Sequence, residues 1–185
     1  GCTVTFKAGT GTGSDYTQSF TAGTAFSLTS MVAQFTAPST CYTFGGWTTG
    51  SDGSGTSYSN AAALTLTSPT TLYANWTGGS CTLQFNANGG SGTMANQTFT
   101  AGAAVTINAM SGFSAPTVCY TFDGWATALG GAMVYGPGAT LVAGTLTGPT
   151  TLYAHWVASN CTLTFSAGST GSGTMTSQTF TAGGT

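Results

Sequence analysis

The sequence predicts a mainly β protein built from tandem copies of one small module of about 80 residues. The first observation is a repeat, because the Cys-Thr-x-x-Phe segment at residues 2–6 returns at 81–85 and again at 161–165. The second is an alternation of apolar and hydroxyl-bearing residues, which is typical of strands with one buried face. The third is a charged fraction of only 2%, since Lys, Glu and Arg ordinarily supply the surfaces of helices. Together they predict an array of small antiparallel or mixed β-sheets.

Each expected strand of the first copy carries the alternating pattern. These strands cover residues 3–6, 25–28, 42–44, 64–66 and 72–76. Thr, Val, Phe and Tyr favour strands, and Gly-rich stretches such as 9–13 and 88–92 are expected to form the turns between them. In residues 30–37 and 109–115 the alternation is lost and a proline follows, at Pro38 or Pro116. One loop or short helical crossover is therefore expected in each module.

The copies keep the same order of motifs over their whole length. The segment Cys-Tyr-Thr-Phe-x-Gly-Trp at 41–47 returns at 119–125, and Pro-Thr-Thr-Leu-Tyr-Ala-x-Trp at 69–76 returns at 149–156. We therefore expect a first module at residues 1–80, a second at 81–160, and the first strands of an incomplete third at 161–185. On this interpretation the chain is a window cut from a longer array.

The low charge excludes two classes of partner. Lys7, Asp15, Asp52 and Asp123 are the only charged residues besides His155. Nucleic acid and anionic membrane surfaces both need clustered Lys and Arg, so neither is an expected partner. No membrane insertion of this segment is expected, because no apolar run reaches the roughly 18 residues that a spanning helix needs. A net charge of −2 gives little repulsion between molecules, which favours association with other copies of the same protein.

The five cysteines follow the repeat. Cys2 and Cys41 fall in the first copy, Cys81 and Cys119 in the second, and Cys161 opens the third. We expect the disulfides Cys2–Cys41 and Cys81–Cys119, with the partner of Cys161 beyond the chain end. A Cys41–Cys81 bond between neighbouring copies is the competing pairing, and buried free thiols are a further alternative. A disulfide in every copy indicates an oxidising compartment.

No catalytic, cofactor-binding or metal-binding residue is predicted. His155 stands where the first copy has Asn75, and Asp123 stands where it has Gly45. Hydrolases need a nucleophile with a base, paired carboxylates or a metal, and no such set recurs between the copies. The cysteines lack the CxxC or paired-histidine spacing of a metal site. A structural module rather than an enzyme is expected.

Four tryptophans stay in phase with the repeat, namely Trp47, Trp76, Trp125 and Trp156. We expect them to be structural aromatic residues, because tryptophan is the largest side chain available to fill a core. The alternative is an exposed platform for sugar rings, formed by Trp47 with Tyr42 or Tyr58.

Three motifs recur in one order and spacing. They are Phe-Asn-Ala-Asn-Gly-Gly at 85–90, Tyr-Thr-Phe-x-Gly-Trp at 42–47 and 120–125, and Thr-Thr-Leu-Tyr-Ala-x-Trp at 70–76 and 150–156. This pattern resembles the Listeria–Bacteroides repeat, also called the internalin-type B-repeat. The resemblance implies a β-grasp-like module that occurs in tandem on large secreted or wall-attached bacterial surface proteins, as a stalk or adhesion segment. The low charge and the paired cysteines depart from that family pattern.

These observations lead to one expectation about function and one alternative. We expect a non-enzymatic structural repeat of an extracellular or cell-surface protein, most consistent with a bacterium, that forms a disulfide-stapled stalk or a self-associating extracellular filament. The alternative is an adhesin module that binds a carbohydrate or a host surface. No cofactor is expected.

Overall fold

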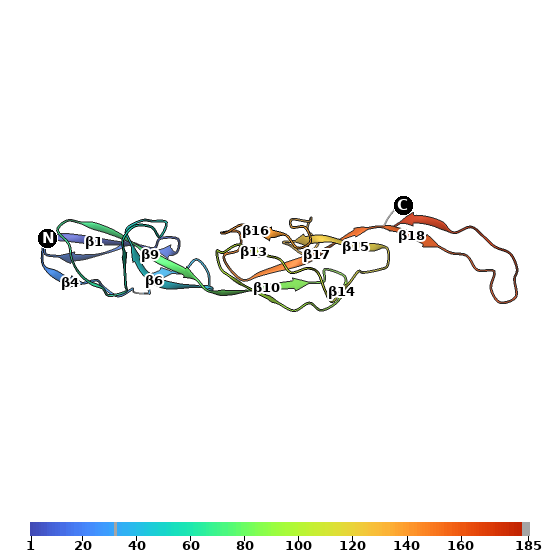
Figure 1. The fold of residues 1–185 in the computed structure, drawn as a ribbon, viewed down its shortest axis with the longest axis horizontal. Coiled ribbons are helices and arrows are strands. Elements are labelled where there is room, and N and C mark those ends of the chain that lie inside the picture. The colour runs from blue at the N-terminus through green and yellow to red at the C-terminus, as the bar shows by residue number, and fades with distance from the viewer. Residues whose placement is uncertain (32, 183–185) are drawn as a thin grey trace. The chain divides into compact units, whose positions relative to one another are not determined.

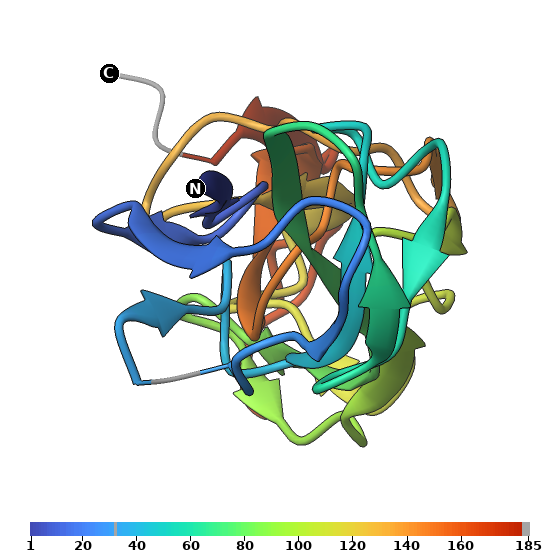
Figure 2. The same cartoon turned by 90° about the vertical axis from the view of Figure 1, so that its left-hand side faces the viewer.

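The computed structural model describes residues 1–31 and 33–182, and in this part of the chain the secondary structure consists of strands and loops without a helix. Figure 1 and Figure 2 show arrows joined by loops throughout the ribbon. The predicted mainly β fold class is therefore confirmed. Val32, which falls in the first expected crossover, and residues 183–185 of the expected third module lie outside the described residues.

The chain divides into two compact units, which are described one at a time. The first unit comprises Gly1–Cys81, Phe99–Ala104 and Val142–Pro149, and the second comprises Thr82–Thr98, Val105–Leu141 and Thr150–Thr185. Two short segments that belong to the second copy in sequence are thus part of the first unit. The module boundaries expected after residues 80 and 160 stay a prediction.

The first unit is built around a five-stranded sheet in the order β3-β1-β9-β6-β7. Its strands are β1 (Cys2–Lys7), β3 (Tyr16–Phe20), β6 (Tyr42–Thr48), β7 (Ser57–Tyr58) and β9 (Thr70–Gly78). Strand β1 runs parallel to β9, and the other neighbours are antiparallel. Two small pairs complete it: β2 (Thr12–Gly13) with β5 (Phe35–Thr36), and β4 (Ala25–Ser27) with β8 (Ala63–Thr65).

A second sheet repeats this order as β12-β10-β17-β15. Its strands are β10 (Ser80–Asn86), β12 (Gln97–Thr100), β15 (Tyr120–Ala126) and β17 (Thr150–Ala158). Here β10 runs parallel to β17, and β15 runs antiparallel to it. The small pairs are β11 (Ser91–Gly92) with β14 (Phe113–Ser114), and β13 (Val105–Thr106) with β16 (Thr140–Leu141). A bridge between Trp125 and Tyr135 stands where the first sheet has β7.

The remaining strands form a hairpin. Strand β18 (Asn160–Leu163) pairs antiparallel with β19 (Gln178–Thr181), as β1 pairs with β3. The residues expected to form the start of a third copy thus adopt the same strand pairing as the start of the first.

The described residues of the segments expected as one loop or short helical crossover per copy lie in loops. Each contains a two-residue strand, β5 in the first copy and β14 in the second. These strands pair with β2 and β11, the short strands that follow the opening strand of each copy. Because this pairing takes up the backbone groups ahead of the proline, the described residues there have no need of a helical turn.

The core of the first unit lies on one face of its sheet. Val4 and Phe6 on β1 and Leu72 on β9 are fully buried, and the residues between them are more exposed. This period of two is the one that the alternating sequence predicts for strands. Trp47 on β6 is also fully buried and packs its ring against Phe6, with the centroids 4.7 Å apart.

A bulge in β6 and in β15 brings one buried tryptophan of each strand, Trp47 and Trp125, onto the core face. The register with the neighbouring strand shifts between Phe44 and Trp47, and again after Phe122. Gly46 and Gly124 lie in the shifted segments at positive φ, and a Cβ on Gly46 would lie 2.5 Å from the carbonyl oxygen of Tyr58. Only glycine fits there, which explains why this residue stays in phase between the copies.

Candidate functional site: the cysteine junctions

Each disulfide joins a cysteine of one copy to the opening strand of the next. The bonds are Cys41–Cys81 and Cys119–Cys161, with Cα atoms 5.5 and 5.3 Å apart, and Cys2 is free. The expected pairing Cys2–Cys41 with Cys81–Cys119 is therefore wrong. So is the expectation that the partner of Cys161 lies beyond the chain end. The pairing between neighbouring copies, considered as the competitor, is the one found.

The direction of the strands explains why Cys41 bonds to Cys81 and not to Cys2. Val4 lies beside Thr70 in the β1/β9 register, which places Cys2 near the start of β9. Tyr42 lies opposite Gly78, which places Cys41 near the end of β9. The two levels are roughly 30 Å apart at the usual rise of a strand, whereas a disulfide needs Cα atoms within about 7 Å. Because β10 begins directly after β9 ends, Cys81 is the cysteine within reach of Cys41.

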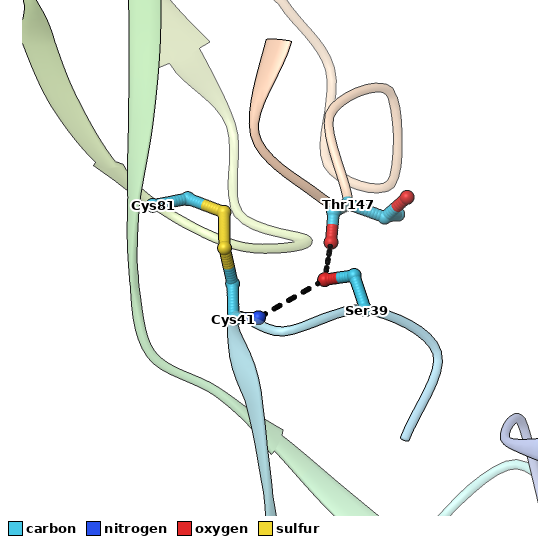
Figure 3. The surroundings of a disulfide bond; sticks show 4 residues. All are labelled: Ser39, Cys41, Cys81 and Thr147. Carbon is cyan, nitrogen blue, oxygen red and sulfur yellow. Dashed lines mark hydrogen bonds between the residues drawn. A yellow bond between two sulfur atoms is a disulfide. The ribbon is translucent and has the colours of Figure 1, made fainter. Parts of the chain in front are cut away.

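Hydrogen bonds hold the residues around the first bond. The N–H of Cys41 donates to Ser39 Oγ at 3.2 Å, and this hydroxyl donates to the carbonyl oxygen of Thr147 at 2.6 Å. Figure 3 shows Ser39 between Cys41 and Thr147, beside the sulfur–sulfur bond. All of these residues lie in the first unit.

The second bond repeats part of this arrangement in the second unit. The N–H of Cys119 donates to Thr117 Oγ1 at 3.3 Å, so a hydroxyl-bearing residue again stands two positions before the cysteine. The carbonyl oxygen of Cys119 accepts from the N–H of Ser159 at 2.7 Å, as that of Cys41 accepts from Gly79 at 2.7 Å. We call each disulfide a junction, together with the hydrogen bond that its first cysteine donates to the hydroxyl two residues earlier and the one that its carbonyl oxygen accepts.

The junctions stabilise the chain by restricting its unfolded state. The bonded cysteines are 40 and 42 residues apart in sequence. A closed loop of this length contributes about 4 kcal/mol on the chain-entropy estimate. In the oxidised chain, consecutive copies are linked twice, once through the backbone and once through sulfur.

The tryptophans fall into two classes. Trp47 and Trp125 are fully buried, so neither forms an exposed platform for a sugar. Trp76 and Trp156 are half-buried. Their indole N–H groups donate to the carbonyl oxygens of Ala8 at 2.8 Å and Ala87 at 2.7 Å, which ties the last strand of each copy to the turn after the first strand.

The one histidine lies within hydrogen-bond distance of an acidic side chain. His155 Nδ1 lies 2.5 Å from Asp123 Oδ1. His155 also lines a shallow cavity of about 370 Å³, together with Asn88, Tyr120 and Trp156. The amide of Asn88 is already bonded to the backbone of Ala154 and Gly130, so its polar atoms serve the fold.

Three ionisable groups in the first unit have shifted pKa values. Burial raises the pKa of Tyr16 to about 12. A hydrogen bond to Asp15, followed by the charge of that residue, raises the pKa of Lys7. Hydrogen bonds from the side chain and backbone of Ser54 lower the pKa of Asp52. The lysine and the two aspartates lie on the surface and do not converge on a common site.

Neither a metal site nor a membrane-spanning helix is found among the described residues. In 1–31 and 33–182, no group of three His, Cys, Asp or Glu side chains is arranged to hold a metal ion. Within the same residues, no helix is long and apolar enough to cross a membrane.

Sequence reasoning missed the residues that surround the cysteines. Ser39 and Thr117 carried a usable signal, because a hydroxyl-bearing residue precedes each of Cys41 and Cys119 by two positions. Thr147 carried none, since its role as an acceptor depends on a segment more than 100 residues away in sequence.

Comparison with known proteins gives one match. The model of the Listeria-Bacteroides repeat domain matches residues 3–75 and again residues 82–155. No curated protein and no solved structure that was searched matches the chain.

Proposed function

The chain belongs to the Listeria-Bacteroides repeat domain family, and we propose that it is a non-enzymatic structural segment of a secreted or cell-surface microbial protein. In this role the copies form a stalk that is covalently reinforced at each junction. The observation that carries the proposal is the pattern of disulfides, in which Cys41 bonds to Cys81 and Cys119 bonds to Cys161. A bond from each copy to the next resists separation of the copies, and an extracellular setting keeps such bonds oxidised.

The location is tested on intact cells of the source organism. We expect an antibody raised against this chain to label the outside of unpermeabilised cells, and external protease to remove the label. Label that appears only after permeabilisation would contradict a surface or secreted role. An antibody to a cytoplasmic protein, used on the same cells, controls for leakage.

The proposal extends to self-association into an extracellular filament. It is supported by a net charge of −2 on 185 residues, which leaves little repulsion between molecules. We expect electron microscopy of the purified chain at high concentration to show assemblies whose length increases with concentration. Single particles at every concentration would reject the filament and leave the stalk.

A carbohydrate-binding adhesin is the second candidate function. The observation that favours it is the shallow cavity beside Tyr120, His155 and Trp156, because aromatic rings next to polar groups suit sugar rings. We expect a saccharide ligand to change tryptophan fluorescence in the wild-type chain and to lose this effect in Tyr120→Ala. Tyr58→Ala, in the first unit, is the matched control. No fluorescence change with any saccharide of a broad panel would reject this candidate.

A further inference from the structure

Cys2 occupies the place in the first copy that Cys81 and Cys161 occupy in the later ones. Cys2 lies opposite Phe20 in the β1/β3 ladder, as Cys161 lies opposite Phe180 in the β18/β19 ladder. Cys81 and Cys161 are each bonded to a cysteine of the copy that precedes them. Cys2 has the same strand environment and a free, partly exposed thiol.

The residues around Cys81 form a socket that a segment of the first copy fills. We define this second-copy socket as Cys81, Ala101, Gly102, Leu146 and Thr147, all of which lie in the first unit. Ala101 is only 5% exposed and Leu146 only 6%.

Three contacts close this socket besides the disulfide. The N–H of Ala101 donates to the carbonyl oxygen of Gly79 at 2.9 Å. A Cβ on Gly102 would lie 2.6 Å from Tyr42 Oη, so the tyrosine hydroxyl lies directly against this glycine. The carbonyl oxygen of Thr147 accepts from Ser39, as described above.

The first copy carries the same socket, and none of the residues that the structure describes fills it. The corresponding residues, which we call the first-copy socket, are Cys2, Ala22, Gly23, Leu66 and Thr67. The two sockets share one backbone hydrogen bond. The N–H of Gly23 donates to the carbonyl oxygen of Leu66 at 2.8 Å in the first, and the N–H of Gly102 donates to that of Leu146 at 2.8 Å in the second.

The residues of the first-copy socket are more exposed to solvent than those of the second-copy socket. Ala22 is exposed where Ala101 is buried, and Leu66 is half-buried where Leu146 is buried. A Cβ on Gly23 would meet nothing within 4 Å. In the described part of the chain, the N–H of Ala22 has no counterpart to the bond that Ala101 makes.

We propose that the first-copy socket receives another copy of this repeat and that Cys2 forms a disulfide with its cysteine at the position of Cys41 or Cys119. The incoming segment has a Ser or Thr two residues before that cysteine and a Tyr directly after it. The hydroxyl donates to the carbonyl oxygen of Thr67, and the tyrosine lies against Gly23. This inference rests on the proposed array of copies and names the residues that extend it in the direction of the N-terminus.

One position of the two sockets differs. Ser68 stands where the second copy has Gly148, and a Cβ on Gly148 would lie 3.2 Å from Ser39 Cβ. The incoming hydroxyl-bearing residue therefore shifts by a few tenths of an ångström when it docks on the first copy.

The bond forms by thiol–disulfide exchange with a small-molecule disulfide such as oxidised glutathione as the oxidant. The Cys2 thiolate attacks one sulfur of glutathione disulfide, and one glutathione leaves as a thiolate. The thiolate of the incoming cysteine then attacks the Cys2 sulfur, and the second glutathione leaves. Two protein thiols are oxidised, one glutathione disulfide is reduced to two thiols, and the two protons pass to the leaving thiolates.

The full-length variant Cys161→Ser tests the proposal, because it frees Cys119 on a chain that also carries Cys2. In a glutathione redox buffer we expect head-to-tail oligomers in which Cys2 of one molecule is linked to Cys119 of another. Docking raises the local concentration of the matched thiols, so we expect this link to exceed each symmetric link by about tenfold. Wild-type chains, whose Cys119 is already bonded, serve as the control and should yield no such oligomers.

A second substitution separates docking from simple thiol access. Ala22→Glu in the Cys161→Ser background alters an exposed residue, so we expect the fold to persist and Cys2 to react with a small aromatic disulfide at an unchanged rate. The Cys2–Cys119 link should fall to the level of the symmetric links. Equal amounts of all three links in Cys161→Ser, or no effect of Ala22→Glu on the Cys2–Cys119 link, would overturn the proposal.

Protein purified from its source gives a test that does not depend on the folding of a variant. We expect non-reducing peptide mapping to find Cys2 bonded to a cysteine in a Ser/Thr-x-Cys-Tyr sequence. An unchanged molecular mass on reduction would place that cysteine on the same polypeptide, and a reduced mass would place it on another. A free or glutathione-bonded Cys2 in all molecules would overturn the proposal, whereas failure of the surface labelling described above would overturn only the proposed location.

Discussion

The two repeated sheets share one order of strands but cover their cores differently. Phe6 on β1 is fully buried, because the ring of Tyr16 stacks on it with the centroids 4.6 Å apart. Its counterpart Phe85 on β10 is half-buried, and the position of Tyr16 is taken by Ala95. The buried Trp of β6 and of β15 is common to both sheets. The ring of Tyr16 over Phe6, which we call the aromatic cover, is present only in the first. The fold therefore depends on the shared tryptophan more than on the aromatic cover.

The surface differs between the copies as well. Among the described residues, the exposed large hydrophobic side chains all lie at or after Val118, and none lies in the first copy. In the β18/β19 hairpin, Leu163 and Phe180 are exposed, whereas their counterparts Leu83 and Phe99 in the second copy are buried. A hairpin of this sequence therefore buries its apolar face only where the later strands of a copy pack against it.

Removal of the shared tryptophan is expected to have the largest effect. Trp47→Ala should cost about 5 kcal/mol and Trp125→Ala about 4 kcal/mol, because a buried aromatic is replaced by a cavity. The first value is the larger because Trp47 also contacts Tyr16, with centroids 6.4 Å apart. Urea denaturation followed by circular dichroism measures both. A cost below about 1 kcal/mol at either position would contradict the claim that these residues determine the fold.

The aromatic cover is expected to contribute less than the tryptophan. Tyr16→Ala should destabilise the first unit by about 2–3 kcal/mol, because it uncovers Phe6 and loses a ring contact with Phe35. Tyr16→Phe keeps the ring and removes a buried hydroxyl that has no partner. It should therefore be neutral or stabilising by up to about 1 kcal/mol.

The reverse substitution in the second copy sharpens the comparison. Ala95→Tyr introduces a ring at the position that corresponds to Tyr16 in the sequence. It should stabilise the second copy by about 1 kcal/mol, because the added ring is expected to cover the half-buried Phe85. The same denaturation assay measures the change. No gain in stability would show that the second sheet has adapted its packing around the smaller residue.

Alkaline pH is expected to affect the first copy through Tyr16. The folded pKa is raised to about 12, whereas an unfolded tyrosine titrates near 10. The unfolded state therefore loses its proton first, and the stability that the neutral phenol provides is present below about pH 10 and is lost between about pH 10 and 12. Because the ring is partly exposed, the loss is on the order of 1 kcal/mol. Tyr16→Phe should remove this part of the pH dependence, and an identical profile in the variant would contradict the assignment.

The smallest effect is expected from the ion pair that is unique to the first copy. Lys7 and Asp15 are paired on the surface, with side chains 41% and 49% exposed. Such pairs are screened by solvent and contribute little. Asp15→Asn should leave the thermal midpoint unchanged within error, although it removes the cause of the raised Lys7 pKa. A loss as large as that of Tyr16→Ala would contradict this ranking.

The sequence predicted the strands and the family because both depend on local patterns. The alternation in residues 3–6 and 72–76 marks the buried face of β1 and β9, and the recurring motifs identify the Listeria-Bacteroides repeat domain. These signals lie within short windows, so they can be interpreted without knowledge of the tertiary fold.

The disulfide pairing could not be predicted in this way. The phase of the repeat groups Cys2 with Cys41, but the parallel pairing of β1 with β9 places them at opposite ends of the sheet. That pairing joins residues more than 60 positions apart, and no local pattern encodes its direction. The loss of Phe85 burial is similar, since it follows from a residue on the neighbouring strand rather than from Phe85 itself.

The pairing of cysteines is the central claim, because both the proposed stalk and the proposed role of Cys2 depend on it. Non-reducing peptide mapping by mass spectrometry, after the free thiol has been alkylated, measures it most directly. The account predicts linked peptides for Cys41–Cys81 and Cys119–Cys161, with Cys2 alkylated in the purified 185-residue chain. A Cys2–Cys41 or Cys81–Cys119 linked peptide as the main product would contradict it.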